Sequence, residues 1–132
     1  MSLPIPTPSK VSADYWAATA RGSLEIQWCR ACSGWVHYPR GGCPRCYSQE
    51  LEFRPVSGRS EIYSFSTVMT KGGFPSYGER VPYTIVLVEL EEGPRMIGNL
   101  VGDADAGASV GAKVRVTFEK RGDISLPQFV LE

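Results

Sequence analysis

Four cysteines are the residues of this chain whose type and spacing point most directly to chemistry. They form two Cys-x-x-Cys pairs, Cys29 with Cys32 and Cys43 with Cys46, and ten residues separate the pairs. Two residues between the cysteines of a pair let both thiolates of a tight turn point at one ion, and two such turns complete a tetrahedron. Because protein fills all four positions, we predict a structural metal site with no position left for water or substrate.

The residues around the cysteines favour zinc, with iron as the competing ion. In rubredoxins four thiolates hold a redox-active iron, and their turns favour glycine soon after the second cysteine of each pair. Here Ser33-Gly34 and Tyr47-Ser48 follow instead. Two disulfides are a further alternative, but they need an oxidising compartment. The N-terminus lacks the basic and apolar regions of a secretory signal, so we expect a cytoplasmic protein.

A catalytic set of side chains is not evident in the sequence. His37 is the single histidine and has no companion base, so we interpret it as a surface residue on the ribbon loop. Asp103 and Asp105 lie in a Gly/Ala-rich loop and are interpreted as turn residues. Serine-hydrolase, P-loop and dinucleotide-binding motifs are also lacking. The sequence therefore predicts a protein that is not itself an enzyme.

Composition and charge limit the partners. The 132 residues are 42% apolar and 21% charged, as in globular proteins, and 14 basic residues balance 14 acidic ones. Residues 1–57 carry a net charge of +2 and residues 58–132 a net charge of −2. A nucleic-acid-binding protein is expected to show a basic excess, so nucleic acid is a disfavoured partner. Apolar runs are too short to cross a membrane.

The chain divides into three predicted parts. Residues 1–22 contain a proline-rich arm (Pro4, Pro6, Pro8) and a short helix that starts at Ser9 or Ser12 and ends near Arg21. Residues 23–54 form the zinc ribbon, entered through an alternating strand at 24–28. Residues 55–132 form the third part.

Strand signals repeat through the third part. We predict strands at 61–69, with Tyr63, Phe65 and Met69 on one face, and at 83–90, buried on both sides. Further strands follow at 95–101, around Val114, Val116 and Phe118, and at 128–131. Five strands with Gly-rich turns suit a small closed barrel, because closure removes exposed edges. The predicted fold is mainly β: a short N-terminal helix, a rubredoxin-like zinc ribbon and a five-stranded OB-like barrel.

A series of motifs in a fixed order extends this prediction. They follow the Trp-containing helix and the first cysteine pair: Tyr38-Pro39-Arg40, Cys43-Pro44-Arg45-Cys46, Val56-Ser57-Gly58-Arg59, Ile62-Tyr63-Ser64-Phe65-Ser66, Pro82-Tyr83, Val88-Glu89-Leu90-Glu91-Glu92-Gly93, Val110-Gly111 and Leu126-Pro127-Gln128-Phe129. Over residues 13–132 the chain resembles the family of OB-fold proteins with a rubredoxin-like zinc ribbon that accompany acyl-CoA enzymes. The resemblance implies a non-catalytic subunit that assembles with thiolases, thiolase-like aldolases or hot-dog-fold enoyl-CoA hydratases and helps to form an acyl-CoA site.

The implied ligand, CoA or acyl-CoA, suggests which residues would hold it. Its phosphates suit Arg and Lys, and its adenine suits an aromatic ring. The loop at 71–80 is expected to expose its aromatic residues, or else to fold them back onto the barrel. The candidate ligand-binding residues are Arg40, Arg45, Lys71, Phe74, Tyr77 and Arg80.

Two other functions remain open at this stage. A single-stranded nucleic-acid-binding OB-fold module would show a basic groove and salt-dependent binding. A rubredoxin-type iron electron carrier would be a red protein.

Overall fold

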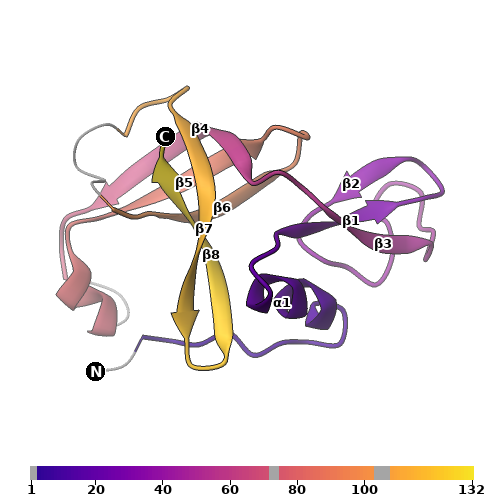
Figure 1. Ribbon diagram of the computed structural model, residues 1–132, viewed down its shortest axis with the longest axis horizontal. Coiled ribbons are helices and arrows are strands. Elements are labelled where there is room, and N and C mark those ends of the chain that lie inside the picture. The colour runs from indigo at the N-terminus through magenta and orange to yellow at the C-terminus, as the bar shows by residue number, and fades with distance from the viewer. Residues whose placement is uncertain (1–2, 72–74, 103–107) are drawn as a thin grey trace.

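The computed structural model describes residues 3–71, 75–102 and 108–132 (Figure 1). A short helix, α1 (Ala13–Ala20), precedes a three-stranded antiparallel sheet with strand order β2-β1-β3. Five strands then form a closed barrel in the order β4-β5-β6-β8-β7. The predicted fold class is confirmed: one short helix, a ribbon and a five-stranded OB-like barrel.

The elements have the following bounds. The ribbon strands are β1 (Glu25–Cys29), β2 (Gly34–Val36) and β3 (Leu51–Pro55). The barrel strands are β4 (Arg59–Val68), β5 (Tyr83–Leu90), β6 (Arg95–Leu100), β7 (Lys113–Arg121) and β8 (Ile124–Leu131), and a 3-10 helix, η1 (Pro75–Arg80), lies between β4 and β5. None of the helices within these ranges has the length and apolar character needed to cross a membrane.

The barrel closes with help from the ribbon. Strands β6 and β8 run parallel and pair only at Leu100 and Phe129. Along the rest of this seam, side chains satisfy the β6 backbone. The Ile97 N–H donates to the hydroxyl of Tyr38, from the ribbon loop, over 3.0 Å. The Asn99 N–H donates to Oε1 of Gln128 over 2.7 Å. The seam is therefore joined by polar side chains, and one of them, Tyr38, also fixes the ribbon loop to the barrel.

Strand β5 is not buried on both sides as predicted. Thr84, Val86, Val88 and Leu90 are buried inside the barrel, whereas the alternate side chains are half-buried or, at Glu89, exposed. The continuous apolar run therefore has an inner face and an outer face, as expected for a small barrel whose interior side chains fill it.

A bulge in β4 changes the face of its aromatic residues. The register against β5 shifts between Ile62 and Ser64, so Phe65 lies opposite the inward-facing Val86. The Tyr63 ring instead lies under the guanidinium of Arg95, whose Cζ is 3.7 Å from the centroid of that ring. The prediction that Tyr63 and Phe65 share one face is therefore wrong, because a bulge interrupts the alternation of side chains.

One apolar core joins the helix, the ribbon and the barrel. Tyr15 of α1 and Ile26 of β1 pack into the same cluster as Val86 and Phe129 of the barrel. Gly98 of β6 makes room for this packing, since a Cβ there would come within 3.1 Å of the Phe129 ring. The second cluster is much smaller and lies in the ribbon, where Val36 packs with Cys29 and Cys43.

Candidate metal centre

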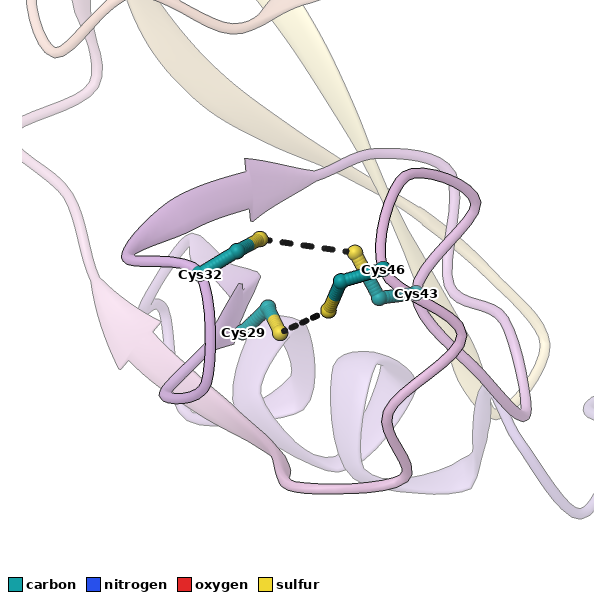
Figure 2. Close-up of side chains that lie close together, drawn as sticks. All are labelled: Cys29, Cys32, Cys43 and Cys46. Atoms are coloured by element: carbon teal, nitrogen blue, oxygen red, sulfur yellow. Dashed lines mark hydrogen bonds between the residues drawn. The ribbon is translucent and has the colours of Figure 1, made fainter.

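The four cysteines converge at the tip of the ribbon, as Figure 2 shows. Their four Sγ atoms all lie within 4.8 Å of one another. Sγ of Cys29 is 3.5 Å from that of Cys46, and Sγ of Cys32 is 3.6 Å from that of Cys43 (Figure 2). All four are free thiols. A disulfide needs about 2.05 Å between sulfurs, whereas ligands at the Zn–S distance of about 2.3 Å in a tetrahedron lie about 3.8 Å apart. The arrangement is a tetrathiolate metal site and not a pair of disulfides.

The backbone forms metal-binding turns without the glycines that such turns favour. Ser33 and Tyr47, which directly follow the second cysteine of each pair, adopt φ values of 55° and 63°. This left-handed region is uncommon for residues with a side chain. In the second turn, the Tyr47 N–H donates to the Cys43 carbonyl over 2.9 Å, and the Cys43 N–H donates to the Ser48 carbonyl over the same distance. The two turns keep the required shape although glycine is missing from both positions.

The environment of the sulfurs favours a bound cation. The pKa of the Cys43 thiol is lowered to about 6, mainly by a hydrogen bond from the Cys46 backbone N–H. The Ser48 N–H also lowers the pKa of Cys46, but burial and the neighbouring sulfurs outweigh it and raise that pKa to about 11. The Cys43 thiol therefore ionises readily, while the Cys46 thiol retains its proton. A metal ion displaces that proton when it binds.

Arg45 lies beside this cluster. Its Nη2 is 3.9 Å from Sγ of Cys32, and this hydrogen bond is the main cause that raises the pKa of the guanidinium. Gly34 makes the approach possible, since a Cβ there would overlap the guanidinium. Arg45 thus contributes positive charge next to thiolates, whatever its role towards a ligand.

The candidate ligand residues fall into two groups. Arg40 and Arg45 lie in the ribbon, whereas Lys71, Tyr77 and Arg80 lie in or beside η1, which Figure 1 shows on the opposite side of the barrel from the ribbon. Phe74 falls outside the described residues. The two groups therefore do not form a single cluster of side chains among the residues that the structure describes.

Hydrogen bonds fix the backbone of Arg40 while its side chain stays exposed. The buried side chain of Gln27 donates to the Arg40 carbonyl over 2.9 Å and accepts from the Arg40 N–H over 2.8 Å. The amide of Gln27 thereby ties the long loop between β2 and the second cysteine pair to β1. Sequence reasoning did not identify this residue.

In the loop group, Tyr77 is half-buried, which matches the second of the two possibilities left open by the sequence, a ring folded back onto the barrel. Its ring centroid is 5.5 Å from that of Tyr83, because η1 turns the side chain towards the barrel. Arg80 is exposed and its guanidinium pairs with both oxygens of Glu119, at 3.3 and 3.4 Å. The loop group thus combines a basic residue with an aromatic ring, as the hypothesis required, but both already have protein partners.

His37 is not a surface residue as interpreted from the sequence. Its ring lies beside Tyr15 and Tyr38, with centroid distances of 5.8 and 4.0 Å. Both ring nitrogens are buried without a hydrogen-bond partner among the described residues. This burial lowers the pKa of His37 to about 4. The residue is part of the packing between α1 and the ribbon loop, which the sequence alone does not bring together.

The tetrathiolate ribbon and the closed barrel together define the class of protein: a zinc-ribbon protein with an OB-fold. Two family descriptions match the chain, "ChsH2, rubredoxin-like zinc ribbon domain" over residues 16–52 and "ChsH2, C-terminal OB-fold domain" over residues 53–119. The chain belongs to this ChsH2, or DUF35, family, which confirms the resemblance stated from the sequence.

The chain is similar to several named proteins. The chain is 30% identical to a chain of the Ltp2-ChsH2(DUF35) aldolase structure, with a TM-score of 0.85 over 96% of this chain and 98% of that one. It is 33% identical to a DUF35 domain-containing scaffold protein of Methanothermobacter thermautotrophicus, over 70% of this chain and 68% of that protein. It is 32% identical to a probable enoyl-CoA hydratase alpha subunit of Thermomonospora curvata, over 96% of this chain. It spans only 39% of that subunit's length.

Proposed function

We propose that this chain is a non-catalytic accessory subunit that scaffolds a thiolase-like enzyme or an enoyl-CoA hydratase and helps to bind its acyl-CoA. The observation that carries the proposal is the likeness to the chain of the Ltp2-ChsH2(DUF35) aldolase, which extends over nearly all of both chains. Relatives named as DUF35 scaffold proteins and as benzoylsuccinyl-CoA thiolase subunit BbsA support it. A tetrathiolate site has no open position for substrate, so the chemistry would come from the partner. The cytoplasmic location predicted above belongs to this proposal.

Zinc is the proposed metal. The four Sγ atoms of Cys29, Cys32, Cys43 and Cys46 match a closed tetrahedral site, the geometry of structural zinc. Zinc would stabilise the ribbon and would not carry electrons. An iron site would make the purified protein red, so its absorption spectrum distinguishes the electron-carrier alternative.

The loop group is the proposed contact for CoA. A cavity of about 280 Å³ lies beside Tyr77 and Arg80 and is also lined by Tyr83. The Lys71 side chain lies against Gly78 of η1, is exposed and has no ion pair among the described residues. A lysine beside η1 and an aromatic ring at the cavity suit a phosphate and an adenine. Arg40 and Arg45 would contact the partner or a distant part of the ligand.

The nucleic-acid alternative is less well supported. Seven basic side chains of the described residues are paired with carboxylates: Arg21, Arg54, Arg59, Arg80, Arg95, Lys113 and Arg121. Binding to a phosphate backbone depends on basic side chains that can replace counterions. Paired side chains on a chain of zero net charge serve this poorly.

A pull-down of the tagged protein from its native cells, with metal analysis of the same sample, tests the proposal. Recovery of a thiolase-like enzyme or an enoyl-CoA hydratase, together with stoichiometric zinc, is the expected result. Recovery of nucleic acid at low salt, or of no acyl-CoA enzyme, would contradict it.

The loop contact needs its own test. The double variant Lys71→Ala, Phe74→Ala should unfold at the same temperature as the parent protein but bind the partner or the acyl-CoA more weakly, by about tenfold. Lys120→Ala removes the same charge from an exposed position of β7 and serves as the control. If binding in both assays matches that of the control, the loop hypothesis is dismissed.

A further inference from the structure

A groove where the N-terminal arm, α1, the ribbon loop and the barrel meet shares Tyr77, but none of the other candidate ligand residues, with the CoA contact proposed above. We call it the junction groove. Its volume is about 670 Å³, within the range of cavities that hold drug-sized ligands. Pro4 and Ile5 of the arm line it, together with Ile97 and Pro127 of the β6–β8 seam. In Figure 1 the arm crosses the β7–β8 hairpin close to its turn on its way to α1, and Nη1 of Arg121 donates to the Pro4 carbonyl there.

The guanidinium of Arg121 lies at this groove with one of its nitrogens unpaired. The Arg121 side chain is only 7% exposed. Its Nε donates to Oε2 of Glu119 over 2.7 Å, and its Nη1 donates to the Pro4 carbonyl over 3.0 Å. Nη2 is buried and has no partner among the described residues. An unsatisfied N–H on a buried cation is costly, so a ligand that accepts a hydrogen bond from it would be stabilised.

The charge around Arg121 favours an anion. Glu119 also accepts from Arg80, so one carboxylate is shared by two guanidiniums and the cluster has a net charge of +1. Gln128 donates to the same carboxylate over 3.4 Å. The nearest acidic group is therefore engaged from three sides, and the remaining positive charge lies beside the groove.

The side chains that line the groove favour an anion that carries an apolar group. Tyr15, Trp16, Tyr38 and Ile97 line the groove, and the Tyr77 ring centroid is 5.5 Å from Cζ of Arg121. Aromatic and aliphatic walls around one buried polar group are typical of small-molecule sites. Nη2 is the nitrogen of this guanidinium that has no partner among the described residues, so a carboxylate oxygen can accept a hydrogen bond from it.

We propose that the junction groove binds a small carboxylate with an apolar, ring-bearing body, held by Nη2 of Arg121 at its charged end and by the aromatic walls at the other. This goes beyond the accessory role, since it needs neither the partner enzyme nor CoA. Arg121 gives no signal in the sequence, because its burial depends on the arm and on Glu119.

The test uses 4-phenylbutyrate and its uncharged analogue 4-phenylbutanol as probes of the full chain, followed by ¹H–¹⁵N spectra. Phenylbutyrate should shift the indole resonance of Trp16 in a saturable way, while those of Trp28 and Trp35 in the ribbon stay unchanged. Arg121→Gln should weaken phenylbutyrate binding about tenfold and leave phenylbutanol binding within twofold. Arg115→Gln removes the same charge from an exposed site on the same strand and should have no effect.

A second variant covers the case in which Arg121→Gln does not fold. Ile97→Asp places a negative charge on the groove wall at a side chain that is already 54% exposed, and should weaken phenylbutyrate binding at least fivefold without unfolding the barrel. The proposal is overturned if the two probes bind equally well to the parent protein. It is also overturned if the Trp16 resonance does not move at about 10 mM phenylbutyrate.

Discussion

The ribbon and the barrel are both small β structures, but different forces hold them together. The ribbon has a separate cluster of three buried side chains, and two of them are the metal ligands Cys29 and Cys43. The barrel shares a continuous apolar core with α1 and the start of β1, centred on side chains such as Phe129 and Val86. A segment too short to bury an apolar core can fold around a metal instead, whereas the barrel needs no such support.

Strand β1 belongs to both regions. Leu24, directly before the strand, and Ile26 near its start pack into the barrel core, and Cys29 at its end lies in the ribbon cluster. Between them, Gln27 bonds the ribbon loop at Arg40. Along this single strand the stabilising interaction therefore changes from apolar packing to metal binding. Substitutions can perturb the two regions separately.

The largest expected effect is the loss of a metal ligand. Cys43→Ser should abolish metal binding and leave residues 29–50 without protection in hydrogen exchange, since the metal supplies on the order of 10–16 kcal/mol to a ribbon of this kind. Cys32→His, which keeps a zinc ligand at an exposed position, should retain the metal and most of the protection. A Cys43→Ser protein that is metal-free yet fully protected would show that the site is not structural.

The next effect concerns the barrel. Phe129→Ala removes a side chain that is fully buried and should lower the free energy of unfolding by about 3–5 kcal/mol while zinc content stays the same. Phe65→Ala makes the same change at a ring that is 40% exposed and should cost less than about 1 kcal/mol. Denaturant unfolding with metal analysis measures both. Equal costs for the two variants would contradict the comparison.

A pH dependence should appear where α1 meets the ribbon loop. The pKa of His37 is about 4 in the folded protein, against 6.5 for the free side chain, because the ring is buried. As the pH falls, His37 is protonated in the unfolded chain before it is protonated in the folded protein. The free energy of unfolding therefore keeps its full value above pH 6.5 and falls by up to about 3 kcal/mol as the pH drops towards 4.

His37→Phe should lack this part of the pH dependence, since phenylalanine fills the same space beside Tyr15 and Tyr38 without titrating. The measurement is the difference in unfolding free energy between parent and variant across that pH range, because protonation of the cysteines affects both proteins. Parallel curves would argue against burial as the cause of the lowered pKa.

The smallest effect is expected at the joint between the two regions. Gln27→Ala removes the two hydrogen bonds to Arg40 and should destabilise the ribbon loop by about 1–3 kcal/mol. Hydrogen exchange at residues 37–42 should rise while the barrel strands keep their protection. Gln27→Glu keeps the acceptor for the Arg40 N–H but sets a carboxylate oxygen against the Arg40 carbonyl, so at neutral pH it should destabilise the loop at least as much as Gln27→Ala. Exchange that rises equally in the barrel would mean that the two regions unfold as one unit.

Much of the fold was predictable because its signals are local. Alternation in β7 and the turn at Gly93 depend on neighbouring residues, and the predicted strands there match the structure closely. Strand β8 was harder to delimit: it begins at Ile124, not at 128, because Pro127 within it resembles a break although the strand continues. The bulge at Tyr63 left no signal in the sequence that separates it from regular alternation.

The sequence by itself determined the metal centre, since the spacing of Cys29, Cys32, Cys43 and Cys46 constrains four sulfurs within two short turns. It also determined the class of fold, through the order of strands and turns. Only the tertiary structure decided the fate of His37, Gln27 and Arg121, whose burial and bonds come from segments far away in the chain. The physical reason is that ligand spacing acts within a turn, whereas burial of a polar side chain depends on which distant elements pack over it.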